Sequence, residues 1–109
     1  MKENKLIAEF MGMKYSDERS FNDGKWTHSI RSLGKFRTSW DWLMPVVEKI
    51  EYIESITHGN QFQVMICEEE VGIYDKHTQT QIVCIPTDGE SKLTNTYKAV
   101  VEFIKNQND

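Results

Sequence analysis

The sequence lacks a long apolar run. A helix that crosses a bilayer needs about 18–20 consecutive apolar residues, and no stretch of the chain approaches that length. The apolar run from Leu6 to Phe10 is short and is interrupted by Glu9, so it does not match a secretory signal. These absences predict a cytoplasmic protein that has no membrane partner.

Cysteine is also scarce, because the chain has only Cys67 and Cys84. Each lies in an apolar, strand-like run, which predicts a buried free thiol and agrees with a reducing compartment. A disulfide between them stays open as an alternative, since two neighbouring strands can place them side by side.

Spacings typical of metal sites and of catalysis are missing. The two cysteines and the histidines His28, His58 and His77 form no C-x-x-C or H-x-x-x-H pattern. The serines are not part of a G-x-S-x-G nucleophile elbow. We therefore expect no metal, no cofactor and no enzymatic activity.

Basic residues are fewer than acidic ones. Thirteen Lys and Arg residues face 17 Asp and Glu residues, which gives a formal net charge of −4 at pH 7. Proteins bind duplex DNA mainly through basic surfaces that neutralise phosphates. The charge balance argues against duplex DNA as a partner.

The chain does contain the material for one folded domain. It has 109 residues, of which 39% are hydrophobic and 28% are charged, a balance typical of globular proteins. No linker, repeat or low-complexity segment divides it. We expect residues 1–109 to form a single domain.

Hydrophobic periodicity predicts an α+β fold. The predicted helices span residues 3–11, 39–56 and 91–106, and the predicted strands span residues 61–67, 71–75 and 80–85. The short connections between the strands imply an antiparallel meander, and we expect helices to pack against this three-stranded sheet. The element order is helix, loop, helix, three strands, helix. Residues 13–37 form the irregular loop segment, in which residues 25–30 are equally compatible with a short strand.

The clearest helix start precedes a pair of tryptophans. Thr38 and Asp41 have the spacing of a capping box, and Gly59 is expected just past the helix end. Pro45 lies beyond the first turn, where it removes one backbone hydrogen bond. Two interpretations stay open: a single helix that bends at Pro45, or a separate turn over residues 39–44 before a main helix that Pro45 opens. The long apolar face favours the single helix.

Three segments of the chain resemble known proteins: residues 6–12, 39–50 and 97–105. They resemble small proteins of gut Bacteroides-type bacteria and their phages, and more distantly the phage ABA-sandwich domain. The shared features are an N-terminal helix that ends in Met11-Gly12 and a later helix with Val46-Val47-Glu48-Lys49. The resemblance implies a phage or prophage accessory protein with helices covering a sheet. Some such proteins blunt host defence by binding a nucleotide signal or a host protein, but no catalytic residue carries over.

A basic and aromatic segment precedes the 39–56 helix. Residues 25–37 contain four basic residues and no acidic one. Bases and aromatic rings beside a helix N-terminus are typical of a site for a small anionic ligand such as a nucleotide. The candidate ligand-binding residues are Lys25, Trp26, His28, Arg31, Lys35, Arg37 and Trp40. The alternative is that the bases pair with acids of the domain and the tryptophans fix the segment to the core.

Three large side chains of the 39–56 helix lie off its predicted buried stripe: Trp42, Met44 and Tyr52. If they are exposed together, they form an apolar patch suited to a protein partner or to a second copy of the chain. The sequence therefore predicts a non-enzymatic protein-interaction or self-association module of phage type. Binding of a small anionic ligand through residues 25–40 is the alternative function.

Overall fold

The computed structural model describes residues 2–17, 20–22, 27–29, 31–55, 59–67, 69–86 and 89–107. The elements, in chain order, are α1 (Lys2–Phe10), β1 (Lys14–Asp17), β2 (Ser20–Asn22), β3 (Thr27–Ser29), the 3₁₀ helix η1 (Arg31–Gly34), α2 (Lys35–Thr38), α3 (Trp40–Glu51), β4 (Glu54–Ser55), β5 (Gly59–Asn60), β6 (Phe62–Ile66), β7 (Glu70–Asp75), β8 (Thr80–Pro86) and α4 (Lys92–Gln107). No helix within these ranges combines the length and the apolar content that a membrane crossing requires.

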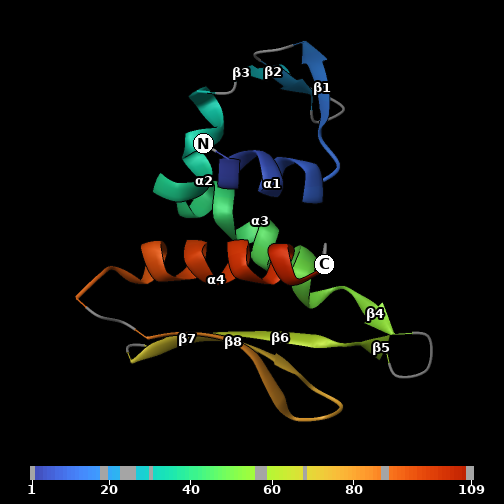
Figure 1. The fold of residues 1–109 in the computed structure, drawn as a ribbon, viewed down its shortest axis with the longest axis vertical. Helices are drawn as coiled ribbons and strands as arrows, with labels where there is room; N and C mark the ends of the chain where they lie inside the picture. Colours follow the sequence, from blue (N-terminus) through green and yellow to red (C-terminus); the bar gives the residue numbers. More distant parts are fainter. Residues whose placement is uncertain are drawn as a thin grey trace.

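The predicted meander is present as an antiparallel sheet in the order β6–β7–β8. Its register places Ile73 opposite Val64 on one side and Val83 on the other. Helix α4 lies across one face of this sheet, and α1 and α2 lie beyond α4 (Figure 1). The α+β fold, the three-stranded antiparallel sheet and the element order are confirmed.

Phe103 of α4 joins the sheet to the N-terminal helix. Its side chain is fully buried. Its ring meets that of Phe62 in β6 at 5.0 Å and that of Phe10 in α1 at 6.5 Å, both edge to face. Such aromatic pairs contribute beyond the apolar area that they bury. Helix α4 therefore connects the part of the core beside the sheet with the part beside α1.

Helix α1 ends at a glycine, as expected from Gly12. Gly12 has a φ of 84°, and its N–H donates to the carbonyl of Glu9 at 3.0 Å. The N–H of Met13 donates to the carbonyl of Ala8 at 2.9 Å. These two bonds form a Schellman motif, which satisfies carbonyls at the end of the helix.

The start of α3 differs from the predicted capping box. Thr38 is the last residue of α2, and its hydroxyl donates back to the carbonyl of Gly34 at 3.4 Å. Ser39 is the extended residue that precedes α3, and it makes no side-chain cap. The Thr38 hydroxyl therefore bonds back toward the start of α2 and does not cap α3, so the predicted capping box is wrong. Pro45 lies inside α3, which agrees with the single-helix interpretation.

Helix α3 is shorter than predicted. It ends at Glu51, and a bond from the N–H of Ile53 to the carbonyl of Ile50 (3.2 Å) tightens the chain into a turn. The carbonyl of Ile53 then accepts from the N–H of Gln61 at 2.9 Å. The chain enters strand β4 at Glu54, so the predicted helix bound at residue 56 is wrong. Gly59 begins strand β5 instead of following the helix end.

The segment 13–37 is more regular than predicted. Strands β1, β2 and β3 form a small antiparallel sheet in which Phe21 pairs with Tyr15 on one side and His28 on the other. Strand β3 falls inside the predicted strand option at residues 25–30. These strands are too short for a periodic pattern to show, and backbone pairing with neighbours defines them instead.

The two thiols are free, but the prediction that they are buried is wrong. Cys67 and Cys84 are both exposed. The helices cover the face of the sheet that carries Val71, Ile73 and Val83, which are buried. Alternation along β8 turns the neighbouring Cys84 to the opposite face. An apolar strand therefore contains exposed residues wherever only one face of its sheet is covered.

Candidate binding site

The structure describes the side chains of only three of the seven predicted ligand residues. Lys25 and Trp26 lie outside the described residues, and only the backbones of His28 in β3 and Arg31 in η1 are described. The remaining three predicted residues, Lys35, Arg37 and Trp40, are exposed on α2 and at the start of α3.

Lys35 and Arg37 point to different neighbours. The ammonium of Lys35 lies 5.4 Å from the ring centroid of Trp42, and that ring packs edge to face on Phe36 at 5.2 Å. The guanidinium of Arg37 lies 5.8 Å from the ring centroid of Tyr97 in α4. Both contacts are cation–π interactions. They separate the two bases, so α2 does not present a single basic cluster.

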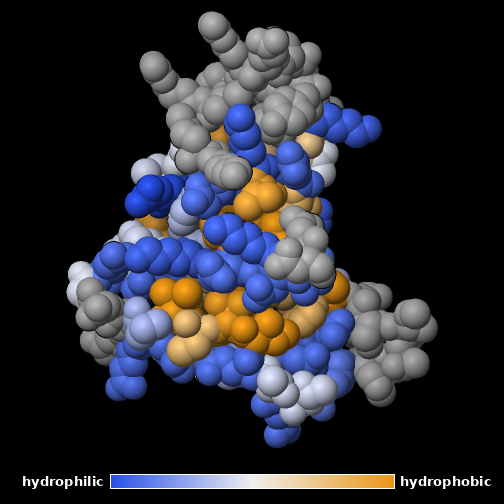
Figure 2. Space-filling view, in the orientation of Figure 1, coloured by the Kyte–Doolittle hydropathy of each residue, from blue (hydrophilic) through white to orange (hydrophobic). Residues whose placement is uncertain are grey.

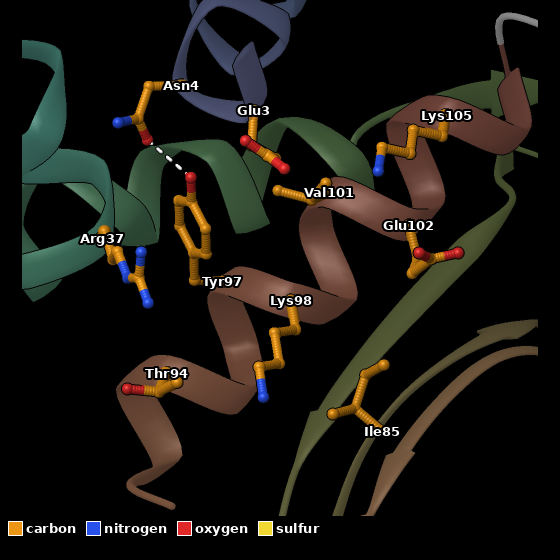
Figure 3. Close-up of a pocket in the computed structure, with 10 residues that line it drawn as sticks. All are labelled: Glu3, Asn4, Arg37, Ile85, Thr94, Tyr97, Lys98, Val101, Glu102 and Lys105. Atoms are coloured by element: carbon orange, nitrogen blue, oxygen red, sulfur yellow. Dashed lines mark hydrogen bonds between the residues drawn. The ribbon is translucent and has the colours of Figure 1, made fainter. Parts of the chain in front are cut away.

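Arg37 lies at a cavity with a volume of about 360 Å³. One face of α4 forms its floor, with α1 and α2 on one side and Ile85 of β8 on the other (Figure 3). The lining residues are Glu3, Asn4, Arg37, Ile85, Thr94, Tyr97, Lys98, Val101, Glu102 and Lys105. The α4 members recur every three or four residues, a spacing visible in the sequence. That spacing identifies one face of a helix, but it does not show which other elements lie opposite this face.

A buried hydrogen bond fixes one wall of this cavity. The hydroxyl of Tyr97 donates to the side-chain oxygen of Asn4 at 2.6 Å, and both residues are buried. Burial, with a contribution from the Glu3 carboxylate, raises the pKa of Tyr97 above its ordinary value of 10.0. The phenol therefore stays neutral and remains a hydrogen-bond donor at physiological pH.

Several charges of the cavity already have neighbours of opposite sign. The ammonium of Lys98 lies 2.6 Å from the carboxylate of Glu90. A hydrogen bond with its own backbone and the nearby Lys105 charge hold the pKa of Glu3 below its ordinary value. The lining thus includes three bases and two acids. An anion binding there competes with these carboxylates, which lowers its net attraction.

The expected apolar patch on α3 has a different composition from the prediction. Met44 and Tyr52 are exposed, at 36% and 69%, whereas Trp42 is half-buried against Phe36. Trp40, at 37%, lies one helical turn before Met44. We call Trp40 and Met44 of α3, together with Tyr52 directly after its last residue, the α3 patch. Sequence reasoning assigned Trp40 to the ligand site and missed its place here, although its spacing of four residues from Met44 was visible.

The open face of the sheet carries a polar network instead of a catalytic arrangement. The thiol of Cys84 donates to the Glu70 carboxylate at 2.9 Å, and Glu70 also accepts from the Tyr74 hydroxyl at 3.4 Å. The hydrogen bond to Glu70, together with partial desolvation of the thiol, raises the pKa of Cys84 above its ordinary value of 9.0. A nucleophilic cysteine requires the opposite shift, because the thiolate is the reactive form.

The described residues contain no group of three or more His, Cys, Asp or Glu side chains placed to hold a metal ion. Comparison of the chain with models of protein families, with curated proteins and with solved structures found no match.

Proposed function

We propose that this protein is a non-enzymatic protein-interaction module whose partner docks on the α3 patch. The observation that carries the proposal is the position of the exposed apolar side chains. Of the four large hydrophobic residues that are exposed in the described chain, Trp40 and Met44 lie one turn apart on α3 and Tyr52 directly follows the end of this helix. Exposed aromatic and methionine side chains are typical anchors of protein interfaces.

The charges around the α3 patch define the kind of partner that it suits. Asp41 and Glu48 are exposed on the same helix. Lys49, the basic residue in the last turn, instead donates to the backbone carbonyl of Phe10 and lies 5.0 Å from the ring centroid of that residue. The patch therefore combines apolar side chains with carboxylates. A protein surface with apolar and basic residues is its complement.

Affinity capture from a host lysate tests this role with matched variants. A bait that carries Met44→Ser and Tyr52→Ser is expected to lose the bound protein. The control Met65→Ser, which removes the fourth exposed apolar side chain from the open sheet face, is expected to retain it. The proposal is wrong if no captured protein depends on the α3 residues, or if the control loses the same protein.

A cytoplasmic setting in a phage or prophage accessory system belongs to this proposal. It is supported by the resemblance of residues 6–12, 39–50 and 97–105 to phage-type proteins, and by two free thiols, which are typical of reducing compartments. Expression of the protein in a bacterial host during phage infection tests the setting. A change in phage yield that disappears in the Met44→Ser and Tyr52→Ser variant supports it, whereas an unchanged yield contradicts it.

Binding of a small anionic ligand is the second candidate function, and the Arg37 side of the α4 cavity favours it. The volume of this cavity falls within the range of about 300–1,000 Å³ typical of ligand pockets. Calorimetric titration with inorganic phosphate and with a nucleotide tests it. Binding that is lost in Arg37→Ala and kept in Lys35→Ala supports this site, because Lys35 faces Trp42 instead. Absence of heat at millimolar ligand removes the candidate.

A further inference from the structure

The two edges of the β6–β7–β8 sheet are not equivalent. At the β6 edge, the Glu51 carboxylate accepts a hydrogen bond from the backbone N–H of Val64 at 3.3 Å. Helix α3, which ends at Glu51, packs beside this strand. A charged side chain that occupies an edge N–H prevents another strand from pairing there. The β6 edge is therefore protected.

The β8 edge has no comparable protection in the described part of the chain. Strand β8 is seven residues long, and no described strand pairs with its outer side. The sequence from Thr78 to Thr87 contains no Asp, Glu, Lys or Arg. Long edge strands without charge are the ones that accept an additional strand. Pro86, at the end of β8, limits such pairing to the residues before it.

The pattern of hydrogen bonds shows which β8 groups point outward. The N–H of Cys67 donates to the carbonyl of Glu70, and the N–H of Lys76 donates to the carbonyl of Gln61. By the alternation of an antiparallel ladder, Val71 and Ile73 then bond toward β8, where they are opposite Ile85 and Val83. The N–H and carbonyl of Cys84, between those two residues, point away from β7.

The surface beside this edge also suits a partner. Apolar surface lies in the band between α4 and the sheet (Figure 2). Ile82, Ile85 and Leu93 are the partly exposed apolar residues that β8 and α4 contribute to the core. Lys98 and Glu102 of α4 line the same side of the molecule as Ile85 (Figure 3).

We propose that β8 pairs antiparallel with β8 of a second copy of this chain, so that two sheets become one continuous six-stranded sheet. A two-fold axis normal to the sheet relates the two strands and brings the outward groups of each Cys84 into the new ladder. The two α4 helices then lie on the same face of the six-stranded sheet and run antiparallel. The absence of charge along β8 removes like-charge repulsion between the identical strands.

Because the β6 edge is protected, further copies cannot add to it and the association stops at a dimer. Pairing of β8 with β6 of the next copy would be a head-to-tail contact, which propagates into filaments. The hydrogen bond between Glu51 and Val64 blocks that contact. The pairing extends the proposed function by adding a second copy, but it uses the edge opposite α3, so either proposal can fail alone.

Light scattering coupled to size exclusion, run under reducing conditions over a range of protein concentrations, tests the pairing. The wild type is expected to form a concentration-dependent dimer. Cys84→Pro removes an outward N–H and keeps the bonds between β7 and β8, so it is expected to raise the dimer Kd about tenfold or more. Cys84→Ser keeps the N–H and is expected to dimerise like the wild type. A wild type that stays monomeric at every concentration, or a folded Cys84→Pro variant that still dimerises, overturns the proposal.

Hydrogen exchange of the wild type decides the matter if Cys84→Pro does not fold. The Cys84 amide is expected to become more protected as the protein concentration rises. The Val83 amide, which bonds to β7, is expected to be protected at every concentration. A Cys84 amide whose exchange rate does not depend on concentration overturns the β8 interface.

Substitution of Glu51 tests separately whether this residue protects the β6 edge. Glu51→Ala frees the N–H of Val64, so we expect species larger than a dimer in sedimentation velocity. Glu51→Gln keeps a side-chain acceptor and is expected to remain dimeric. If Glu51→Ala shows no species beyond the dimer, Glu51 does not protect this edge.

Discussion

At the scale of single residues, the contact between Tyr97 and Asn4 places a polar pair inside an apolar layer. The two residues are 93 positions apart in the chain and are buried between α1 and α4. A buried hydrogen-bonding group that loses its partner retains the cost of leaving water. The bond therefore ties α1 to one orientation on α4.

Tyr97→Phe removes the donor of this bond and is expected to lower the free energy of unfolding by about 1–3 kcal/mol. Urea denaturation at neutral pH measures the loss. Asn4→Ala and the double variant serve as controls. If the hydrogen bond is the cause, the double variant loses less than the sum of the two single losses. Strictly additive losses would contradict this explanation.

Asp75 organises the turn between β7 and β8. Its carboxylate accepts hydrogen bonds from the Gln61 side chain at 3.2 Å and from the backbone N–H groups of His77 (2.9 Å) and Thr78 (3.3 Å). The bond from Gln61, followed by that from His77, holds the pKa of Asp75 below its ordinary value of 3.8. The ionised carboxylate thus stabilises the hairpin more than the protonated carboxyl does.

Because the folded-state pKa is depressed, this stabilisation is present above pH 3.8 and is lost as the pH falls through the folded-state value. Asp75→Asn is expected to melt at a lower temperature than the wild type at pH 7. The difference is expected to shrink as the pH falls below 3.8. Thermal unfolding followed by circular dichroism from neutral to acidic pH measures it. A difference that is constant over this range would show that the charge of Asp75 has no part in it.

At the scale of elements, the helix ends divide into those that local sequence determines and those that neighbours determine. The end of α1 depends on Gly12, whose positive φ is accessible to glycine at little cost. After α3 ends, the carbonyl of Ile53 bonds to the N–H of Gln61, which lies between β5 and β6 and is distant from the helix in the chain. Sequence reasoning located the first end and missed the second for this reason.

Gly12→Ala is expected to destabilise the protein by about 1–2 kcal/mol, because an L side chain at a φ of 84° is strained. Gly34 is a matched control, since its φ is −59° and both glycines have open space where a Cβ would lie. Gly34→Ala is expected to cost nothing or to stabilise slightly. Urea denaturation of both variants measures the difference. Equal losses for the two variants would show that backbone conformation is not the cause.

At the scale of the whole molecule, Phe103 carries the connection between the sheet and α1. Its ring is in contact with Phe62 and Phe10, so its removal opens a cavity at the junction of two layers. Phe103→Ala is expected to cost about 3–5 kcal/mol. This is a large part of the roughly 5–15 kcal/mol that holds a typical domain folded.

Chemical denaturation of Phe103→Ala measures this cost, and Phe103→Leu, which keeps most of the volume, is expected to lose less. Sedimentation at a fixed concentration should show that Phe103→Leu still associates like the wild type, because β8 is unchanged. A loss below about 1 kcal/mol for Phe103→Ala would contradict the role of this junction.

The sequence by itself determined the α+β class, the antiparallel meander, the buried stripes of the helices and the uncharged run that becomes β8. These features follow from periodicity and from charge, which are properties of residues near one another in the chain. Tertiary structure alone decided that Cys84 is exposed, that Trp42 packs on Phe36, that Arg37 meets Tyr97, and that Glu51 protects β6. Alternation identifies two faces of a strand and two sides of a sheet, but only the placement of distant helices decides which face is covered and which edge stays open.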